Sequence, residues 1–306
     1  MASYKTPWIV KYQPDTVDEM GLSQEQKDMF NKFINDNTLP GIILYGSPGC
    51  GKSTLARIIS QSLDADVLYH HCSGDNGGVN MVRTKIASFC EMMSPRNKIV
   101  ILDEADGLSS VTGQGAGAQM ALRDIIPASL KDTRFIMTCN YPDKIIDALR
   151  SRCQPIKINF GVEDILKFIY HILTNEKINF TSDDVKTFYE KCVKPKVPDI
   201  RSIVETLQLC CADGTLKVIS SVKPIVDNEI IDFITKSKDP KEIRKYLINN
   251  EDKFSADYIQ LARQLFNLYT NDVEAMLIIA ENLYKMNIVI DKEIQFTAMI
   301  IQLKQK

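Results

Sequence analysis

Apolar residues follow two patterns in the first half of the chain. Some form short continuous runs, and others recur at the spacing of a helix. Short apolar runs that are typical of buried strands lie at residues 42–45, 66–71, 134–140 and 155–160, and four more apolar residues lie within KIVILDEAD at residues 98–106. Segments with apolar residues at helical spacing lie between or before them, at residues 24–35, 54–63, 79–93 and 119–126, the last ending at a proline. Strands that alternate with helices predict an α/β fold, a parallel sheet with helices on both faces and ligands at the carboxyl ends of the strands.

The second half of the chain shows helical periodicity alone. Residues 163–221 read as a small group of helices, and residues 226–303 read as about five amphipathic helices. We therefore predict an α/β domain over residues 1–160, a helical domain over 161–221 and a second helical domain over 222–306. The high apolar content of the last helices suggests packing against other subunits, although an ordinary helical core is the alternative.

The sequence IILYGSPGCGKST at residues 42–54 matches the P-loop pattern G-x-x-x-x-G-K-[ST]. In such a loop the backbone N–H groups cradle phosphate oxygens at the positive end of the next helix. Lys52 would reach the β- and γ-phosphates, and the Ser53 hydroxyl would hold Mg²⁺. A glycine-rich turn with a chance lysine is disfavoured, because the required strand and helix flank the motif.

Two adjacent carboxylates, Asp103 and Glu104, end the buried run KIVILDEAD. An acid at the tip of a strand parallel to the P-loop strand can hold Mg²⁺, and a second acid beside it can activate water as a general base. This pairing favours hydrolysis over transfer to a small acceptor. The alternative is a strand capped by two solvated acids, which the upstream P-loop makes the weaker interpretation.

Other polar residues are open to two interpretations on the sequence alone. Asn140 either contacts a γ-phosphate or forms a turn before Tyr141-Pro142. Arg152 is either a finger that stabilises transition-state charge or a solvated arginine. Arg83 and Lys85, which lie off the apolar stripe of their helix, are first interpreted as a solvated face. The segment from Pro7 to Pro14 is expected to be an irregular surface arm.

Composition limits the classes of function. The formal net charge is −2, whereas a free-standing nucleic-acid binder is usually basic, so any DNA contact must come from a local face or from assembly. The 8 Cys include no C-x-x-C, which favours a reducing intracellular compartment, cytoplasm or nucleus, over a zinc site or disulfide framework. The N-terminus does not resemble a signal peptide. The sequence contains no run of 18 apolar residues, so we expect no membrane span and no membrane partner.

The order of these motifs resembles that of AAA+ clamp-loader ATPases. The P-loop, LDEAD, the strand ending in Asn140, Ser151-Arg152-Cys153 and Asp199-Ile200-Arg201 occur in the family's order. The chain looks similar to small subunits of replication factor C and to the large ATPase subunit of tailed-phage clamp loaders, and Pro-Asp-Ile-Arg hints at a viral source. The resemblance implies a P-loop domain, a helical lid and a helical collar. It also implies that ATP and Mg²⁺ drive loading of a sliding clamp onto primer–template DNA, with hydrolysis stimulated by DNA and clamp.

The resemblance also implies a nucleotide site. PWIVKYQP resembles the family's PWVEKYRP box, which wraps the adenosine, with Val10 and Gln13 in place of the family's Glu and Arg. Asn140 resembles sensor 1, and Arg201 resembles sensor 2, a lid arginine that reaches the phosphates. The nucleotide-binding residues implied in this way are Ile9, Val10, Lys11, Tyr12, Gly21, Gly49, Cys50, Gly51, Lys52, Ser53, Thr54 and Arg201.

Assembly and DNA contact follow from the same resemblance. Ser-Arg-Cys is the family's arginine finger, so Arg152 is expected to reach the ATP of a neighbouring subunit in a roughly pentameric assembly. Gln119 and Arg123 resemble the polar pair on the central helix, where Asp124 replaces the family's second arginine. GVNMVRTKI resembles a helix that faces the DNA backbone, which moves Arg83 and Lys85 from a solvated face to phosphate contact. Several copies would sum these few cations along the duplex.

Three rival functions share some of these features. Another AAA+ machine, such as a branch-migration helicase, shares the P-loop and sensors but not the Ser-Arg-Cys finger or the KYQP box. A non-hydrolysing scaffold subunit is disfavoured by intact Lys52, Asp103, Glu104 and Arg152. A small-molecule kinase is disfavoured by the two helical domains that follow.

Overall fold

The computed structural model describes residues 6–73, 78–108, 117–218, 228–251, 254 and 256–305. The chain divides into two compact units, residues 1–189 with 196–217 and residues 190–195 with 218–306. The glycine-rich loop expected between residues 107 and 118 and the domain boundary expected at residues 220–224 fall largely outside the described residues. The finer division at residues 160 and 161 stays a prediction.

A five-stranded parallel sheet forms the centre of the first unit, in the order β2-β3-β4-β1-β5. Its strands are β1 (Ile42–Tyr45), β2 (Asp66–His71), β3 (Lys98–Asp103), β4 (Thr133–Cys139) and β5 (Gln154–Lys157). All six residues of β3 are buried, which agrees with a central strand covered on both faces. The predicted α/β fold is confirmed. The last strand is shorter than expected, because the chain leaves the sheet and Phe160 instead forms an isolated bridge with Leu22.

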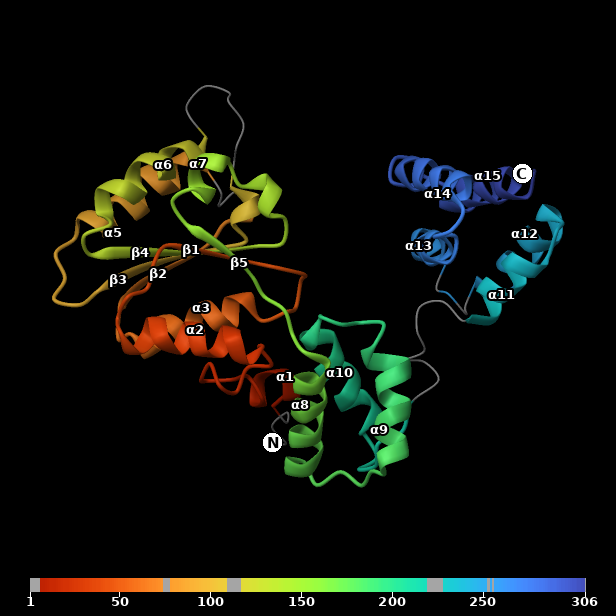
Figure 1. The fold of residues 1–306 in the computed structure, drawn as a ribbon, viewed down its shortest axis with the longest axis horizontal. Helices are drawn as coiled ribbons and strands as arrows, with labels where there is room; N and C mark the ends of the chain where they lie inside the picture. The colour runs from red at the N-terminus through yellow and green to blue at the C-terminus, as the bar shows by residue number, and fades with distance from the viewer. Residues whose placement is uncertain are drawn as a thin grey trace, which may run out of the picture. The chain divides into compact units, whose positions relative to one another are not determined.

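Helices cover both faces of this sheet (Figure 1). One face carries α2 (Gln24–Asn35) and α3 (Lys52–Ser62), whose apolar side chains pack with Ile42, Ile101 and Ile136. The other face carries α6 (Ala118–Ser129) and α7 (Asp147–Arg150), together with the helical stretch from residue 79 to 91, around Val100 and Phe135. Burial of two apolar clusters against one sheet fixes the strands in place.

Two helices differ from the expectation. The helix expected to stop at Pro127 continues to Ser129, because a proline in the last turn removes only one intrahelical hydrogen bond and Pro127 is exposed. The stretch from residue 79 is divided into α4 (Val79–Met81), a π-helical turn (Val82–Ile86) and α5 (Ala87–Glu91). Its predicted apolar stripe is buried at Val82 and Ile86.

The N-terminal segment is also more ordered than expected. Residues Trp8–Lys11 form the single-turn helix α1, in which the N–H groups of Val10 and Lys11 both donate to the Pro7 carbonyl at 3.0 Å. Pro7 fits before a helical turn because its missing N–H would have no helical partner there. This helix lies beside α10 in the structure (Figure 1).

Three helices follow the sheet within the first unit: α8 (Val162–Asn175), α9 (Ser182–Phe188) and α10 (Ile200–Cys210). We refer to residues 161–189 with 196–217 as the lid. Thr181 begins α9 with a reciprocal capping box to Asp184, and the Asp199 carboxylate caps α10 by accepting from the Ser202 N–H at 3.0 Å. The lid is therefore a locally well-specified helical group.

The second unit consists of helices around their own core. Its five helices in the described residues match the predicted number, and they are α11 (Asn228–Lys236), α12 (Pro240–Asn249), α13 (Tyr258–Leu268), α14 (Val273–Met286) and α15 (Lys292–Gln305). Ile234, Leu261, Ile279 and Phe296 meet in the core. Among the described residues, no helix is both long and apolar enough to cross a membrane.

A buried lysine closes the end of α5. Lys98 is 1% exposed, and its Nζ donates to the carbonyls of Cys90 and Met92, the latter at 2.7 Å. Its Nζ also lies 3.3 Å from a carboxylate oxygen of Asp132. The ammonium thus satisfies carbonyls that have no partner within the helix.

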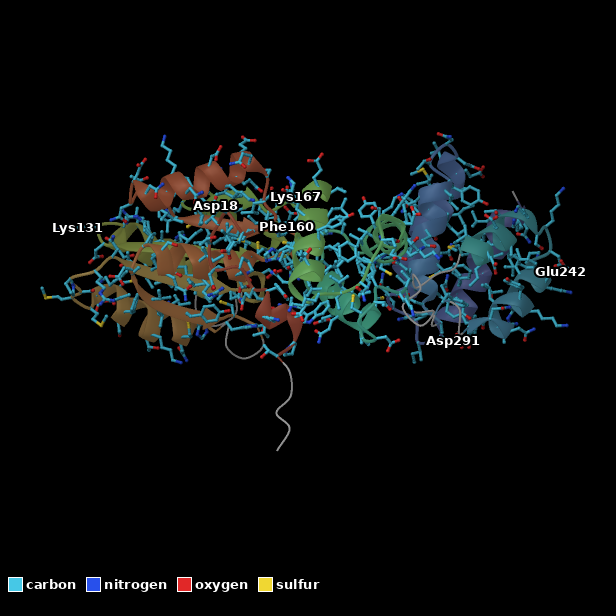
Figure 2. The ribbon with its side chains drawn as sticks, turned by 90° about the horizontal axis from the view of Figure 1, so that it is seen from below. Asp18, Lys131, Phe160, Lys167, Glu242 and Asp291 are labelled. Atoms are coloured by element: carbon cyan, nitrogen blue, oxygen red, sulfur yellow. The ribbon has the colours of Figure 1, made fainter. Side chains whose placement is uncertain are left out.

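We expect Lys98→Met to lower the free energy of unfolding by about 2–3 kcal/mol, because buried carbonyls would lose their donor. Denaturant unfolding followed by circular dichroism measures this change. Lys131→Met is the matched control, because Lys131 is exposed on the same domain (Figure 2) and its loss should leave stability unchanged. Equal effects of the two substitutions would show that Lys98 does not hold α5.

Candidate active site

The P-loop connects β1 to α3 and surrounds the amine of Lys52. Gly46, Gly49 and Gly51 have positive φ angles, which side chains with a Cβ adopt only at a cost. The Lys52 Nζ donates to the carbonyls of Gly46 and Ser47, both at 2.9 Å, and to Asn140 Oδ1 at 2.8 Å. The structure thus brings together two residues that are 88 positions apart and that separate sequence motifs assign to the phosphates.

The Asp103 carboxylate joins three strands and the P-loop helix. Its Oδ1 accepts from the Ser53 hydroxyl at 2.6 Å and from the Thr138 hydroxyl, and its Oδ2 accepts from Tyr69. Burial by itself would raise the pKa of Asp103, but the hydrogen bonds from Ser53, Thr138 and Tyr69 outweigh it and hold the pKa below its usual value. The carboxylate is therefore ionised at neutral pH.

Two hard oxygen donors, Ser53 Oγ and the ionised Asp103, thus lie together at the tip of β3. This set fits Mg²⁺, which prefers carboxylate and hydroxyl oxygens and completes its shell with phosphates and water. Tyr69 and Thr138 were not predicted. Thr138 lies on β4 one position beyond the pairing of Leu102 with Met137 and so falls opposite Asp103, a register that only the structure reveals.

Glu104 has a different environment from its neighbour. Its backbone lies in the left-handed region, with φ of 55°, and its N–H donates to the Thr138 hydroxyl at 3.0 Å. This conformation turns the side chain away from the line of the strand, where it is half exposed and its Oε1 lies 3.7 Å from His71 Nε2. Glu104 is therefore free to contact water, as a general base requires.

Asp106 fixes the position of Asn140. One carboxylate oxygen of Asp106 accepts from the backbone N–H groups of Asn140 and Tyr141, both at 3.2 Å. These bonds hold the end of β4 so that the Asn140 amide faces Lys52. Nothing in the sequence marks Asp106 beyond its place in LDEAD.

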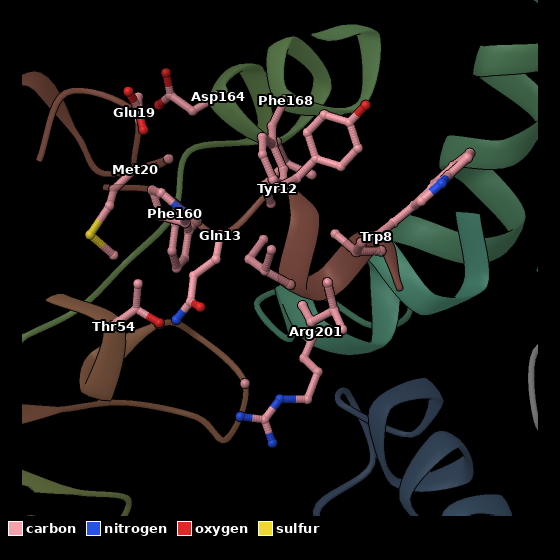
Figure 3. Close-up of a pocket in the computed structure, with 18 of the residues that line it drawn as sticks. Trp8, Tyr12, Gln13, Glu19, Met20, Thr54, Phe160, Asp164, Phe168 and Arg201 are labelled. Carbon is pink, nitrogen blue, oxygen red and sulfur yellow. The ribbon is translucent and has the colours of Figure 1, made fainter. Parts of the chain in front are cut away.

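A cavity of about 280 Å³ opens beside the P-loop, between α1, the lid and the sheet domain (Figure 3). Arg201 and Gln13 extend into it from α10 and from the segment after α1 (Figure 3). The predicted nucleotide-binding residues that line this cavity are Ile9, Val10, Tyr12, Gly21, Gly49, Gly51, Lys52, Ser53, Thr54 and Arg201.

Two predicted nucleotide contacts lie elsewhere. The Lys11 side chain faces an adjacent cavity and pairs with Glu176, since its position on the single turn of α1 directs it to the lid. Cys50 is buried beneath the loop, and burial raises the pKa of its thiol, so any phosphate contact of Cys50 would come from its backbone N–H. Both assignments otherwise stay predictions.

Arg152 is exposed and is not among the residues that line the cavity of its own chain. Its guanidinium donates to the Ala148 carbonyl at 2.7 Å. On the neighbouring helix, Arg123 pairs with Asp124 at 2.9 Å, whereas Gln119 is buried. The Gln119 amide bonds to the carbonyls of Leu108 and Lys144 and accepts from the Ile146 N–H, which fixes the start of α7.

Comparison with known proteins agrees with this geometry. A family model described as the ATPase family associated with various cellular activities (AAA) matches residues 42–161. The chain is 30% identical over 241 residues to replication factor C subunit 4 of Saccharomyces cerevisiae, an alignment that covers 75% of the chain and 73% of that relative. It is 29% identical over 248 residues to the replication factor C small subunit of Saccharolobus solfataricus, covering 78% and 69%.

Solved structures share the fold. A point variant of Thermotoga maritima RuvB superposes with a TM-score of 0.52 at 16% identity, covering 78% of this chain and 79% of that one. At this identity the likeness shows the fold alone. Fold, P-loop geometry and family model together define an AAA ATPase. The chain belongs to the replication factor C family of these ATPases, as its sequence relatives show.

Among the three P-loop glycines, Gly49 leaves the least room for a side chain. A methyl group at residue 49 would lie 1.9 Å from Asp199 Oδ1, and the Gly49 φ is +74°. We expect Gly49→Ala to lower kcat/KM for ATP by about 10²-fold, because the loop must shift to relieve the overlap. Steady-state ATPase assays measure this loss.

Two variants separate the overlap from backbone strain. Gly214 has a nearly identical φ of +76°, and a Cβ added there would have no atom within 4 Å. Gly214→Ala therefore introduces backbone strain without a steric overlap and should leave turnover unchanged. Asp199→Ser keeps a capping oxygen but shortens the side chain, so it should restore part of the activity of Gly49→Ala. No rescue by Asp199→Ser would contradict the assignment of the overlap to Asp199.

Proposed function

We propose that this chain is an ATP-driven subunit of a sliding-clamp loader that places a ring clamp on primer–template DNA. The observation that carries this proposal is the division of its catalytic groups. Lys52, Asp103, Glu104 and Asn140 lie at the carboxyl ends of the strands, whereas the exposed Arg152 precedes β5, at the amino ends of the strands. Such a site would be completed by the arginine of a neighbouring subunit, which makes hydrolysis depend on assembly.

The residues that line the cavity, together with those at the ends of β3 and β4, suggest how hydrolysis would proceed. The P-loop N–H groups and Lys52 would bind the phosphates, and Asn140 would orient the γ-phosphate or the attacking water. Glu104 would take the proton from that water as the water oxygen attacks the γ-phosphorus. The bond from this phosphorus to the oxygen bridging the β-phosphate would break, and ADP would leave. Ser53 and Asp103 would hold Mg²⁺, which when bound neutralises charge on the phosphate oxygens. Arg201 would approach the phosphates from the lid, and the neighbour's Arg152 would stabilise the charge of the transition state.

An apolar stripe on α14 supports assembly with like subunits. Val273, Leu277 and Tyr284 recur at helical spacing on one face of α14, and Ile288 lies just past its end. Each of the four is at least 66% exposed. Ile290 and Ile294 extend the apolar surface past the end of the helix. A contiguous apolar surface of this kind marks a protein–protein interface, and self-association of the helical unit would bury it.

A short basic segment supports contact with DNA. Arg83 and Lys85 are exposed on the π-helical turn, while Val82 and Ile86 anchor the same turn in the core. A cation can bind phosphate without reading the base sequence, so a loader could act at any primer end. With a net charge of −2, one chain would bind DNA weakly, and several copies around a duplex would add their contacts.

The rival function, a branch-migration motor, rests on the likeness to RuvB, which is confined to the fold at 16% identity. The sequence relatives at about 30% identity are replication factor C subunits, and they favour the loader.

Complementation between two inactive variants tests whether Arg152 acts across an interface. Arg152→Ala keeps its own catalytic groups, and Glu104→Gln keeps its arginine. Each assembly alone should lose at least about 10²-fold in turnover, and an equal mixture should recover about a quarter of the wild-type rate, since one interface in four joins an intact site to an intact finger. ATPase assays after co-refolding or subunit exchange measure the recovery. A mixture as inactive as its components would contradict the finger in trans.

We expect Leu277→Glu to dissociate the assembly, because it places a charge in the centre of the apolar stripe. Light scattering after size exclusion measures the change in mass, and circular dichroism should show an unchanged fold. Ile248→Glu is the control, since Ile248 is an exposed apolar residue on α12, outside the stripe. Retention of the full mass by Leu277→Glu would contradict the proposed interface.

A further inference from the structure

Helix α1 is bonded to the lid at two separate points. Lys11 Nζ pairs with Glu176 Oε1 at 2.5 Å, and the Tyr12 hydroxyl donates to the same oxygen at 2.8 Å. At the other end of the helix, the Trp8 N–H donates to Gln208 Oε1 at 2.9 Å. Glu176 directly follows α8 and Gln208 lies on α10, so both acceptors belong to the lid.

Aromatic packing reinforces these bonds. The Tyr12 ring meets the rings of Trp8 and His171 edge-on, with centroids 6.5 and 6.0 Å apart. The Glu176 side chain is only 19% exposed, so its bonds form in a partly desolvated site, where they are stronger than on an open surface. Burial and the bond to Glu176 raise the pKa of Tyr12, which keeps its hydroxyl protonated as a donor.

The chain changes partners immediately after α1. Arg57 on α3 donates to the Pro14 carbonyl at 2.9 Å and lies 3.5 Å from the Asp15 carboxylate. Val17 and Met20 then enter the apolar cluster beneath the sheet. The chain therefore contacts the lid up to Gln13 and the sheet domain from Pro14 onward.

From this arrangement we infer that Glu176 is a positioning residue for the nucleotide, which fastens α1 to the lid so that the two form one wall of the cavity. Trp8, Ile9, Val10 and Tyr12 line that wall together with Arg201, and the P-loop lines the opposite wall. Any closing of the lid that brings Arg201 to the phosphates then also brings α1 to the other end of the nucleotide. The inference rests on the proposed nucleotide site and adds a residue that does not touch the nucleotide.

Trp8 provides a direct measurement, because it is the only tryptophan of the chain and is 9% exposed. Acrylamide quenching of its fluorescence reports whether α1 stays on the lid. We expect Glu176→Ala to increase quenching and to raise the Kd for ATPγS about tenfold, as loss of charge-assisted hydrogen bonds predicts. The KM for ATP should rise with it, while kcat stays within about twofold because Glu176 does not reach the reacting atoms.

Two further variants bracket this result. Glu176→Gln keeps an oxygen acceptor for Tyr12 and should retain most of the affinity. Glu205→Ala removes an exposed acid from α10 and should change neither quenching nor affinity. If Glu176→Ala proves unfolded by circular dichroism, Gln208→Ala tests the second bond in the same way.

The outcomes separate this inference from the proposed site. If Lys52→Ala weakens ATPγS binding but Glu176→Ala leaves the Kd unchanged, the positioning role is wrong even if Trp8 becomes exposed. If Lys52→Ala itself has no effect on the Kd, the nucleotide does not bind in this cavity, and both proposals are overturned.

Discussion

The hydrogen bonds around the Asp103 carboxylate hold together the edge of the sheet at which the proposed catalytic residues lie. They connect β2 through Tyr69, β4 through Thr138 and the P-loop helix through Ser53 to the tip of β3. A buried carboxylate is costly unless several donors stabilise its charge, and here three donors lower its pKa despite burial. The same threonine also receives the Glu104 N–H, so the two acids are held in different environments by one shared neighbour.

The two acids therefore suit two different roles in one proposed site, a cation ligand and a general base. Asp103 is enclosed and ionised, as a ligand for a hard cation should be, whereas Glu104 is half exposed and turned out of the strand by a left-handed backbone conformation. Lys52 and Asn140, which come from two other elements and are hydrogen-bonded to each other, would complete the phosphate side of the proposed site. Arg152 is exposed away from this edge, as the proposed assembly, in which each subunit completes the next, would require.

Much of the fold followed from the sequence, because the periods of its apolar residues are clear. Four strands of the sheet were predicted close to their observed bounds, and the number of helices in the second unit was predicted. The P-loop and LDEAD pointed to residues that do meet at the carboxyl ends of the strands. The contacts that depend on distant parts of the chain were not predictable. No local pattern joins Glu176 to Lys11 or Asp199 to Gly49, since the members of each pair lie far apart in the sequence.

Local rules also failed where neighbouring effects outweighed them. Pro127 does not end its helix, because it is exposed and lies in the last turn, where a proline removes only one intrahelical hydrogen bond. The π-helical turn at Val82–Ile86 keeps the predicted apolar positions buried, so periodicity alone could not reveal it. Thr138 lies within a run of buried strand residues and gave no sign of chemistry until its register opposite Asp103 was known.

Whether the chain is a clamp-loading ATPase can be decided by ATPase rates of the assembled wild-type chain with primer–template DNA, with its sliding clamp, and with both. A loader should show weak stimulation by either alone and a rate with both that exceeds the sum of the separate increases, since clamp and DNA would order the same interfaces. A rate that ignores the clamp, or that responds to four-way junction DNA more than to primer–template DNA, would contradict the loader and favour a branch-migration motor.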